Sequence, residues 1–173
     1  MTVGRHTYGH NLISIHQWLE TPANGNLIIG SFCSIANGVN VFLGGNHRHD
    51  WITTFPFGWT HSRNFKKMSG PHIATNGDVV IENDVWIGSN VTIMSGVRIG
   101  CGSVIAANSH IVKDVEPYSM VGGNPARLIK QRFSHDVIDK LLKIQWWNWD
   151  DEKINSNIDI LCSNDLDSLD QFL

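Results

Sequence analysis

The sequence predicts an all-β protein folded as a parallel β-helix, with a protruding loop and a short C-terminal helical tail. A six-residue spacing persists for 36 residues, and one position of each hexad is always isoleucine: Ile81, Ile87, Ile93, Ile99, Ile105 and Ile111. Four residues after each isoleucine stands only Val or Ser. Three residues after it stand Asp84, Asn90, Gly96, Gly102, Asn108 and Asp114. Asp, Asn and Gly tolerate a left-handed backbone at tight turns, and a period of six is typical of a parallel β-helix.

The same register extends toward the N-terminus. The inward series continues through Ile29, Ile35 and Val41, and more loosely through Val3, Gly9 and Ile15. Further members are a turn at Gly38 and inward positions at Cys33 and Val39. A cysteine at an inward position is expected to be a buried free thiol, because free Cys behaves as a small hydrophobic residue.

One segment must leave the stack. Val41 and Ile81 are 40 residues apart, which is not a multiple of six, so an excursion of about residues 44–78 is expected. Insertions into repeat stacks usually become functional loops on one face. This segment carries a concentration of polar groups, namely His47, Arg48, His49, Asp50, His61 and His72. We therefore expect the catalytic residues to lie in this excursion.

The hexads stop after Pro125, which predicts a β-helix over residues 1–132 and a helical extension over residues 133–173. Ser134 is a reasonable N-cap for a helix through Lys143, and Asp150 for a second helix. That second helix would carry Ile154, Ile158 and Leu161 on one face. The tryptophan-rich segment 146–149 is expected to pack these helices onto the prism.

Composition excludes several classes of function. The net charge of −3 combines 10 Lys/Arg and 7 Asp/Glu in residues 1–133 with 3 and 9 in residues 134–173. An acidic tail argues against nucleic-acid binding, which depends on clustered basic residues. The sequence has no apolar run of 18 residues and no signal-peptide pattern, so we expect a cytoplasmic protein without membrane insertion. Three scattered cysteines without a close Cys/His cluster predict no metal site.

Three further segments resemble one enzyme family. They are Val85-Trp86-Ile87-Gly88, Gly122-Gly123-Asn124-Pro125-Ala126 and Trp146-Trp147-Asn148-Trp149. Together with Gly45-Asn46-His47-Arg48 and Thr54-Phe55-Pro56-Phe57, they resemble the xenobiotic acetyltransferase group of hexapeptide-repeat acyltransferases. This group includes streptogramin and chloramphenicol acetyltransferases and sugar-modifying relatives. The resemblance implies a left-handed β-helix, a homotrimer with active sites between subunits, and acetyl-CoA as the acetyl donor.

The resemblance also implies roles for particular residues. His47 matches the family's catalytic histidine, a general base that removes a proton from the acceptor. Trp86 matches a residue close to that histidine, while Asn46 and Asp50 are expected to orient it. Tyr8 matches an acceptor-contacting tyrosine. Positions along the donor's pantetheine arm and phosphates are matched by Ser89, Ala106, Ala107, Lys113, Arg127 and Lys130.

The small-molecule acceptor is expected to be a sugar or nucleotide-linked sugar of surface polysaccharide, with transfer to a hydroxyl or an amine. The alternative is O-acetylation of an antibiotic such as streptogramin A or chloramphenicol. A non-catalytic β-helix scaffold would explain the repeats but not a histidine-bearing excursion beside a cationic rim. A γ-type carbonic anhydrase needs a pair of His ligands with four residues between them, and no His pair here has that spacing.

Overall fold

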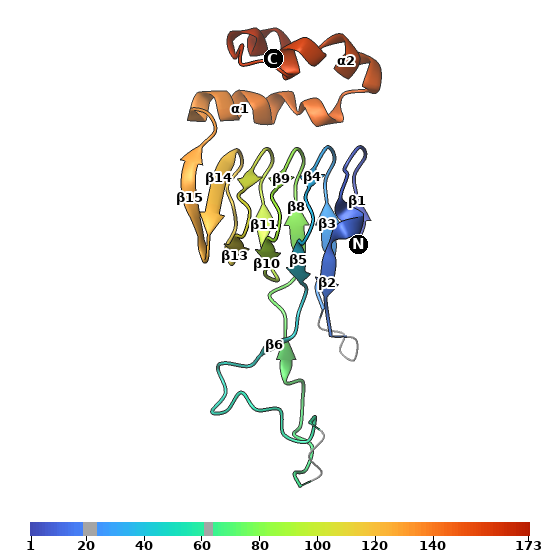
Figure 1. Ribbon diagram of the computed structural model, residues 1–173, viewed down its shortest axis with the longest axis vertical. Helices are drawn as coiled ribbons and strands as arrows, with labels where there is room; N and C mark the ends of the chain where they lie inside the picture. Colours follow the sequence, from blue (N-terminus) through green and yellow to red (C-terminus); the bar gives the residue numbers. More distant parts are fainter. Residues whose placement is uncertain (19–23, 61–63) are drawn as a thin grey trace.

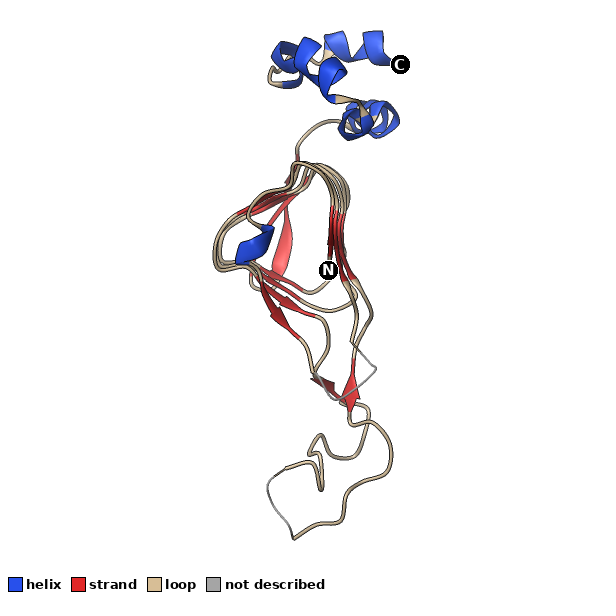
Figure 2. Cartoon of the chain, turned by 90° about the vertical axis from the view of Figure 1, so that its right-hand side faces the viewer, coloured by secondary structure: helices blue, strands red, loops and turns tan. Residues whose placement is uncertain are grey.

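The computed structural model describes residues 1–18, 24–60 and 64–173, which form a three-sided prism with a loop at one corner and helices over another (Figures 1 and 2). The first wall is the parallel set β1 (Thr2–Val3), β3 (Leu27–Ile29), β8 (Val79–Ile81) and β11 (Arg98–Ile99). The second wall contains β4 (Ser34–Ile35), β9 (Trp86–Ile87), β12 (Val104–Ile105), β14 (Ser119–Gly123) and the antiparallel β15 (Ala126–Gln131). The third wall contains β2 (Ser14–His16), β5 (Asn40–Phe42), β10 (Thr92–Ile93) and β13 (His110–Ile111).

The isoleucines of the hexads fill the centre of the prism. Successive coils stack in register, so that Ile81 pairs with Ile99, and Ile87 pairs with Ile105. All six are at most 1% exposed. The parallel β-helix predicted from the hexads is therefore confirmed. Cys33 is a buried free thiol, as expected.

The turns between the walls follow the sequence pattern with one exception. Asp84, Asn90, Gly96, Gly102 and Asn108 all have positive φ angles, between 58° and 79°. Asp114 is not among the residues with positive φ, and the expectation of an equivalent turn there is wrong. Its carboxylate instead accepts a hydrogen bond from the backbone N–H of Arg98 at 2.8 Å, which fastens the last coil to the coil before it.

We name the three corners by what lies at them. The tail corner, between the first and second walls, contains Asp84 and Gly102. The open corner, between the second and third walls, contains Asn90 and Asn108. The loop corner, between the third and first walls, contains Gly96.

The first coil keeps the six-residue register, but its inward positions differ from those of the later coils. Val3 pairs with Ile29 and Ile15 pairs with Val41, as the sequence predicts. Ile15 is nevertheless 37% exposed, because β2 is the last strand of its wall and no coil covers it. Gly9 has a φ of 78°, and a Cβ there would lie 1.8 Å from the carbonyl oxygen of Ile35. Only glycine fits at that position, so the first coil has no inward side chain there; the 3₁₀ turn η1 (His10–Leu12) follows it.

The excursion leaves the prism at the loop corner, after β5, and extends away from the walls (Figure 1). Its neck is a two-stranded antiparallel ladder of β6 (Asn46–His47) and β7 (Ile73–Ala74), in which His47 pairs with Ile73. The Thr75 hydroxyl donates to the Leu43 carbonyl at 2.7 Å and closes the neck against the prism. His61 lies outside the described residues.

After β15 the chain forms short helices above the tail corner (Figures 1 and 2). They are α1 (His135–Ile144), η2 (Trp146–Asn148), α2 (Asp151–Ser156), α3 (Ile158–Leu161) and η3 (Asp167–Phe172). Asp150 caps α2 by accepting from the Lys153 N–H at 2.7 Å, whereas Ser134 precedes α1 without a side-chain capping bond. The expected second helix is interrupted at Asn157, where φ is −124°.

This C-terminal segment packs on the prism through aromatic side chains. Trp147 is 4% exposed in a cluster with Cys101 and Tyr118 of the prism, and Trp146 lies 4.8 Å from the ring of Phe32. The predicted packing role is confirmed for Trp146 and Trp147, whereas the Trp149 ring lies 4.8 Å from the ring of Phe172. Phe32 and Tyr118 have φ angles of 60° and 55°, a conformation that costs a non-glycine residue roughly 1–3 kcal/mol. Both rings pack on the C-terminal segment, Phe32 against Trp146 and Tyr118 in the cluster with Ile138 and Trp147.

The same segment reaches the opposite end of the prism. The Arg5 guanidinium, in the first coil, pairs with the Asp151 carboxylate at 2.6 Å and donates to the Trp147 carbonyl at 3.2 Å. Tyr118 belongs to the last coil. The C-terminal segment therefore contacts both ends of the stack.

Candidate active site

His47 stands at the neck of the excursion, where β6 leaves the loop corner. It lines a cavity of about 420 Å³ together with Asn46, Arg48, His49, Asp50, Ala74, Asn76, Met94 and Val112. Met94 and Val112 come from the prism, so the cavity lies between the loop and the loop corner. The side chain of His47 is exposed and accessible to a substrate.

One hydrogen bond sets the chemical state of His47. Its Nδ1 lies 2.8 Å from the carbonyl oxygen of Thr54. A carbonyl oxygen only accepts hydrogen bonds, so Nδ1 carries the proton and, in the neutral ring, Nε2 carries the lone pair. The imidazole is thereby prepared to accept a proton at Nε2. Thr54 lies in the segment quoted for the family resemblance, but its backbone contact had no sequence signal of its own.

The residues expected to orient His47 contact other groups. The Arg48 guanidinium donates to the Asp50 carboxylate at 2.7 Å and lowers the pKa of that carboxyl to about 2. The Asn46 amide donates to the Ser95 hydroxyl at 3.2 Å and ties β6 to the prism. Asn46 and Asp50 therefore shape the cavity beside His47, while the contact that fixes its tautomer comes from Thr54.

Tyr8 and Trp86 lie together on a different part of the molecule. Both belong to the second wall, where Tyr8 bridges to Ser34 and Ser34 pairs with Trp86 on the next coil. They are 64% and 56% exposed. The second wall is opposite the loop corner, so within one chain these two side chains are separated from His47.

The small residues expected along the donor are also separated from His47. Ser89, Ala106 and Ala107 lie at the open corner, between the second and third walls. The Ser89 hydroxyl donates to the Asn37 amide oxygen at 2.9 Å, which links neighbouring coils. One chain thus presents His47 at one edge of the third wall and the small-residue row at the other edge.

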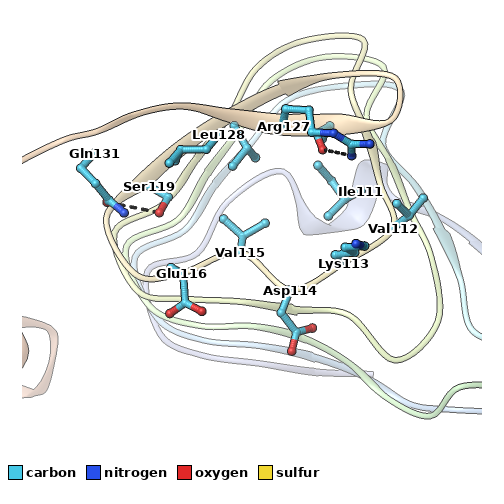
Figure 3. Close-up of a pocket in the computed structure, with 12 residues that line it drawn as sticks. Ile111, Val112, Lys113, Asp114, Val115, Glu116, Ser119, Arg127, Leu128 and Gln131 are labelled. Carbon is cyan, nitrogen blue, oxygen red and sulfur yellow. Dashed lines mark hydrogen bonds between the residues drawn. The ribbon is translucent and has the colours of Figure 1, made fainter.

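A second cavity, of about 390 Å³, lies at the end of the prism formed by the last coil (Figure 3). Lys113 and Arg127 lie at its right-hand rim in that view, with Asp114 and Glu116 at its lower rim. Val112 lines both this cavity and the one beside His47. Lys130 is exposed on β15 and does not line it. The structure brings two of the three expected cations, Lys113 and Arg127, to one cavity at this end of the prism.

Known proteins agree with this architecture. Residues 78–113 match the family model described as bacterial transferase hexapeptide (six repeats). A probable macrolide acetyltransferase from Lysinibacillus sphaericus is 54% identical over 79% of this chain and 77% of its own length. A chloramphenicol acetyltransferase from Klebsiella aerogenes is 41% identical over 98% of this chain and 86% of its own length.

The chain belongs to the xenobiotic acetyltransferase group of hexapeptide-repeat acyltransferases. A hexapeptide-repeat-containing acetyltransferase from Vibrio cholerae has a similar crystal structure, with a TM-score of 0.53 and 31% identity over 76% of this chain and 62% of that chain. The protein is accordingly an acetyltransferase that uses acetyl-CoA as co-substrate, and family membership implies left-handed winding of the prism.

Two further properties of the described residues concern metal binding and membrane-spanning helices. No group of three His, Cys, Asp or Glu side chains among them is arranged to hold a metal ion. Nor does any helix in residues 1–18, 24–60 and 64–173 have the length and apolar character needed to span a bilayer.

Proposed function

We propose that this acetyltransferase O-acetylates an antibiotic of low polarity by direct transfer, with His47 as the general base. The observation that carries the proposal is the 2.8 Å contact between His47 Nδ1 and the Thr54 carbonyl beside a 420 Å³ cavity. The sequence alone favoured a saccharide acceptor. The antibiotic alternative has better support, because the relatives with 54% and 41% identity carry antibiotic names.

The loop itself offers an apolar surface suited to such an acceptor. Phe55 follows Thr54 directly, and its ring packs against Phe57 at 4.9 Å, which in turn packs against Phe65 at 5.0 Å. These rings are between 37% and 51% exposed. Exposed aromatic clusters usually mark binding surfaces, and rings bind the apolar body of an antibiotic more readily than a hydrated polysaccharide precursor.

His47 can perform both proton transfers of the reaction. Its Nε2 removes the proton from the acceptor hydroxyl as that oxygen bonds to the thioester carbonyl carbon. The carbon–sulfur bond then breaks, and the imidazolium returns the proton to the departing thiolate. No covalent enzyme intermediate is needed, because the thioester is already activated.

Thiol release from acetyl-CoA, measured over a panel of acceptors, tests the choice of acceptor. We expect chloramphenicol, streptogramin A or a macrolide to give kcat/KM values about 10²-fold above those of simple sugars, a ratio that pocket contacts can supply. If a sugar gives a higher kcat/KM than every antibiotic, the acceptor is a saccharide and the antibiotic proposal is wrong. If no acceptor supports thiol release, the alternative of a non-catalytic β-helix scaffold is favoured.

We also propose that the active protein is a homotrimer in which each site lies between two chains. His47 at the loop corner and the row of Ser89, Ala106 and Ala107 at the open corner are far apart within one chain. A ring of three prisms can bring the loop corner of one chain to the exposed Tyr8 and Trp86 of the next. A cytoplasmic location is consistent with the use of acetyl-CoA.

The phosphates of the donor are proposed to bind Lys113 and Arg127 at the end of the prism, with Lys130 at the periphery. Arg127→Glu should raise the KM for acetyl-CoA roughly tenfold, because a charge-assisted hydrogen bond contributes about 1.5–3 kcal/mol. The effect should be largest at low ionic strength, where charges are least screened. Steady-state kinetics with varied acetyl-CoA measures it.

Lys143→Glu is the matched control for this charge reversal, because Lys143 is exposed on α1 and away from the cavity. Its KM for acetyl-CoA should equal that of the wild type, and the KM for the acceptor should change little in either variant. Equal KM values for Arg127→Glu and the wild type would mean that the phosphates bind elsewhere.

A further inference from the structure

The loop contains a second histidine, His72, that lies behind His47 and has no role in the proposed reaction. It precedes β7, whose Ile73 pairs with His47 in the neck of the excursion. Whereas most of the loop is exposed, His72 is only 6% exposed. The two imidazole rings meet edge to face, with centroids 6.1 Å apart and an interplanar angle of 89°. His72 thus forms a buried surface against which the His47 ring lies.

His72 is itself held in place by a row of stacked groups. Its ring lies 4.8 Å from the ring of Trp59, and the Lys67 ammonium lies 3.4 Å from the centre of Trp59 on a cation–π contact. Burial, and then the neighbouring His47 and Lys67, lower the pKa of His72. The neutral ring therefore adds no charge beside His47 when His47 takes up a proton.

The contact between the two histidines is one of ring against ring. Within the described part of the chain, the buried Nδ1 of His72 has no hydrogen-bond partner. The Nδ1 of His47 is already bonded to Thr54. His47 therefore contacts the buried ring of His72 and forms no hydrogen bond with it.

We propose that His72 is a positioning residue that holds the plane of the His47 imidazole, so that Nε2 stays directed into the cavity. This inference rests on the proposed role of His47 as the base. The Thr54 carbonyl fixes one ring atom, and a single hydrogen bond leaves the ring free to tilt about it. The buried ring of His72 removes that freedom. A misplacement of about 1 Å between reacting groups costs about 10²-fold in rate.

Two substitutions at position 72 separate ring shape from polarity. His72→Gln keeps a polar side chain without a ring, and we expect kcat to fall about 10- to 100-fold with an unchanged KM for acetyl-CoA. His72→Phe keeps a buried ring without nitrogen, and its kcat should stay within about threefold of wild type, as volume-conserving changes are tolerated best. Lys66→Ala, at an exposed lysine of the same loop, is the control and should leave kcat unchanged.

Imidazole ¹⁵N NMR of His47 provides a second readout that does not depend on activity. All three proteins should keep the Nδ1–H tautomer that Thr54 sets, while the His47 ring resonances should broaden by exchange in His72→Gln alone, because its ring is free to tilt. Melting temperatures establish that both variants are folded. The proposal is overturned if His72→Gln keeps the wild-type kcat and the wild-type His47 line widths, or if His72→Phe is as slow as His72→Gln. Activity in a His47→Ala enzyme would instead refute the base assignment, whatever the variants at position 72 do.

Discussion

Replacement of His47 by alanine should lower kcat by about 10² to 10⁴, the contribution that general-base catalysis typically makes. The KM for acetyl-CoA should remain nearly unchanged, because Lys113 and Arg127 line a separate cavity at the end of the prism. Steady-state kinetics with an alcohol acceptor measures both constants. The wild-type rate should rise with pH through one ionisation and then level off, since only neutral imidazole accepts a proton.

Other histidines test whether this loss is specific. His49→Ala should reduce kcat far less, although His49 lines the same cavity, because among the described residues no group hydrogen-bonds its ring as Thr54 does that of His47. His135→Ala, at an exposed position at the start of α1, should behave as wild type. If His49→Ala is inactive and His47→Ala is active, the base has been assigned to the wrong histidine, while the enzyme class remains.

Two inactive variants should restore activity to each other if sites lie between chains. His47→Ala removes the base, and Ala107→Trp places a bulky ring in the small-residue row at the open corner. Coexpressed in equal amounts, the two chains should form mixed trimers, and about a third of the sites in a mixed trimer should combine an intact His47 with an intact Ala107 from a neighbouring chain. Purified mixed trimers should then show about that share of wild-type kcat.

A site contained within one chain predicts a different outcome. Every chain in the mixture carries one of the two defects, so activity would stay at the level of the single variants. Separately purified variants mixed without exchange of subunits serve as the control and should remain inactive. A stable monomer in sedimentation equilibrium at micromolar concentration would exclude the shared site directly.

The sequence predicted the prism because its rule is local and repeated. An inward isoleucine and a turn residue recur every six positions, and Asp84, Asn90 and Asn108 adopt positive φ angles, as this pattern predicts. The pattern failed at Asp114, where no further complete coil follows and the carboxylate binds the backbone of Arg98. Phe32 and Tyr118 could not be predicted as turn residues, because aromatic residues disfavour positive φ. Their surroundings include residues far away in the sequence, such as Trp146 beside Phe32.

The candidate site was predictable in its residue types and less so in its geometry. His47 and the cations Lys113 and Arg127 were identified from motifs, and the structure places them on neighbouring cavities. The partner of His47 is a backbone carbonyl seven residues away, and every residue has a carbonyl, so sequence offers no signal for it. The separation of Trp86 from His47 depends on which wall each occupies.

The C-terminal segment contacts Arg5 in the first coil and Tyr118 in the last coil, and these contacts should change how the stack unfolds. In a simple repeat array each coil touches only its neighbours, so unfolding starts at an end and spreads inward. Here the same C-terminal segment holds both terminal coils, so loss of its contacts with one coil should also weaken its contacts with the other. We therefore expect the array to unfold as a single cooperative unit. Thermal unfolding would then be all-or-none, and the two terminal coils, ordinarily the weakest points of a solenoid, would exchange their amide protons no faster than its middle.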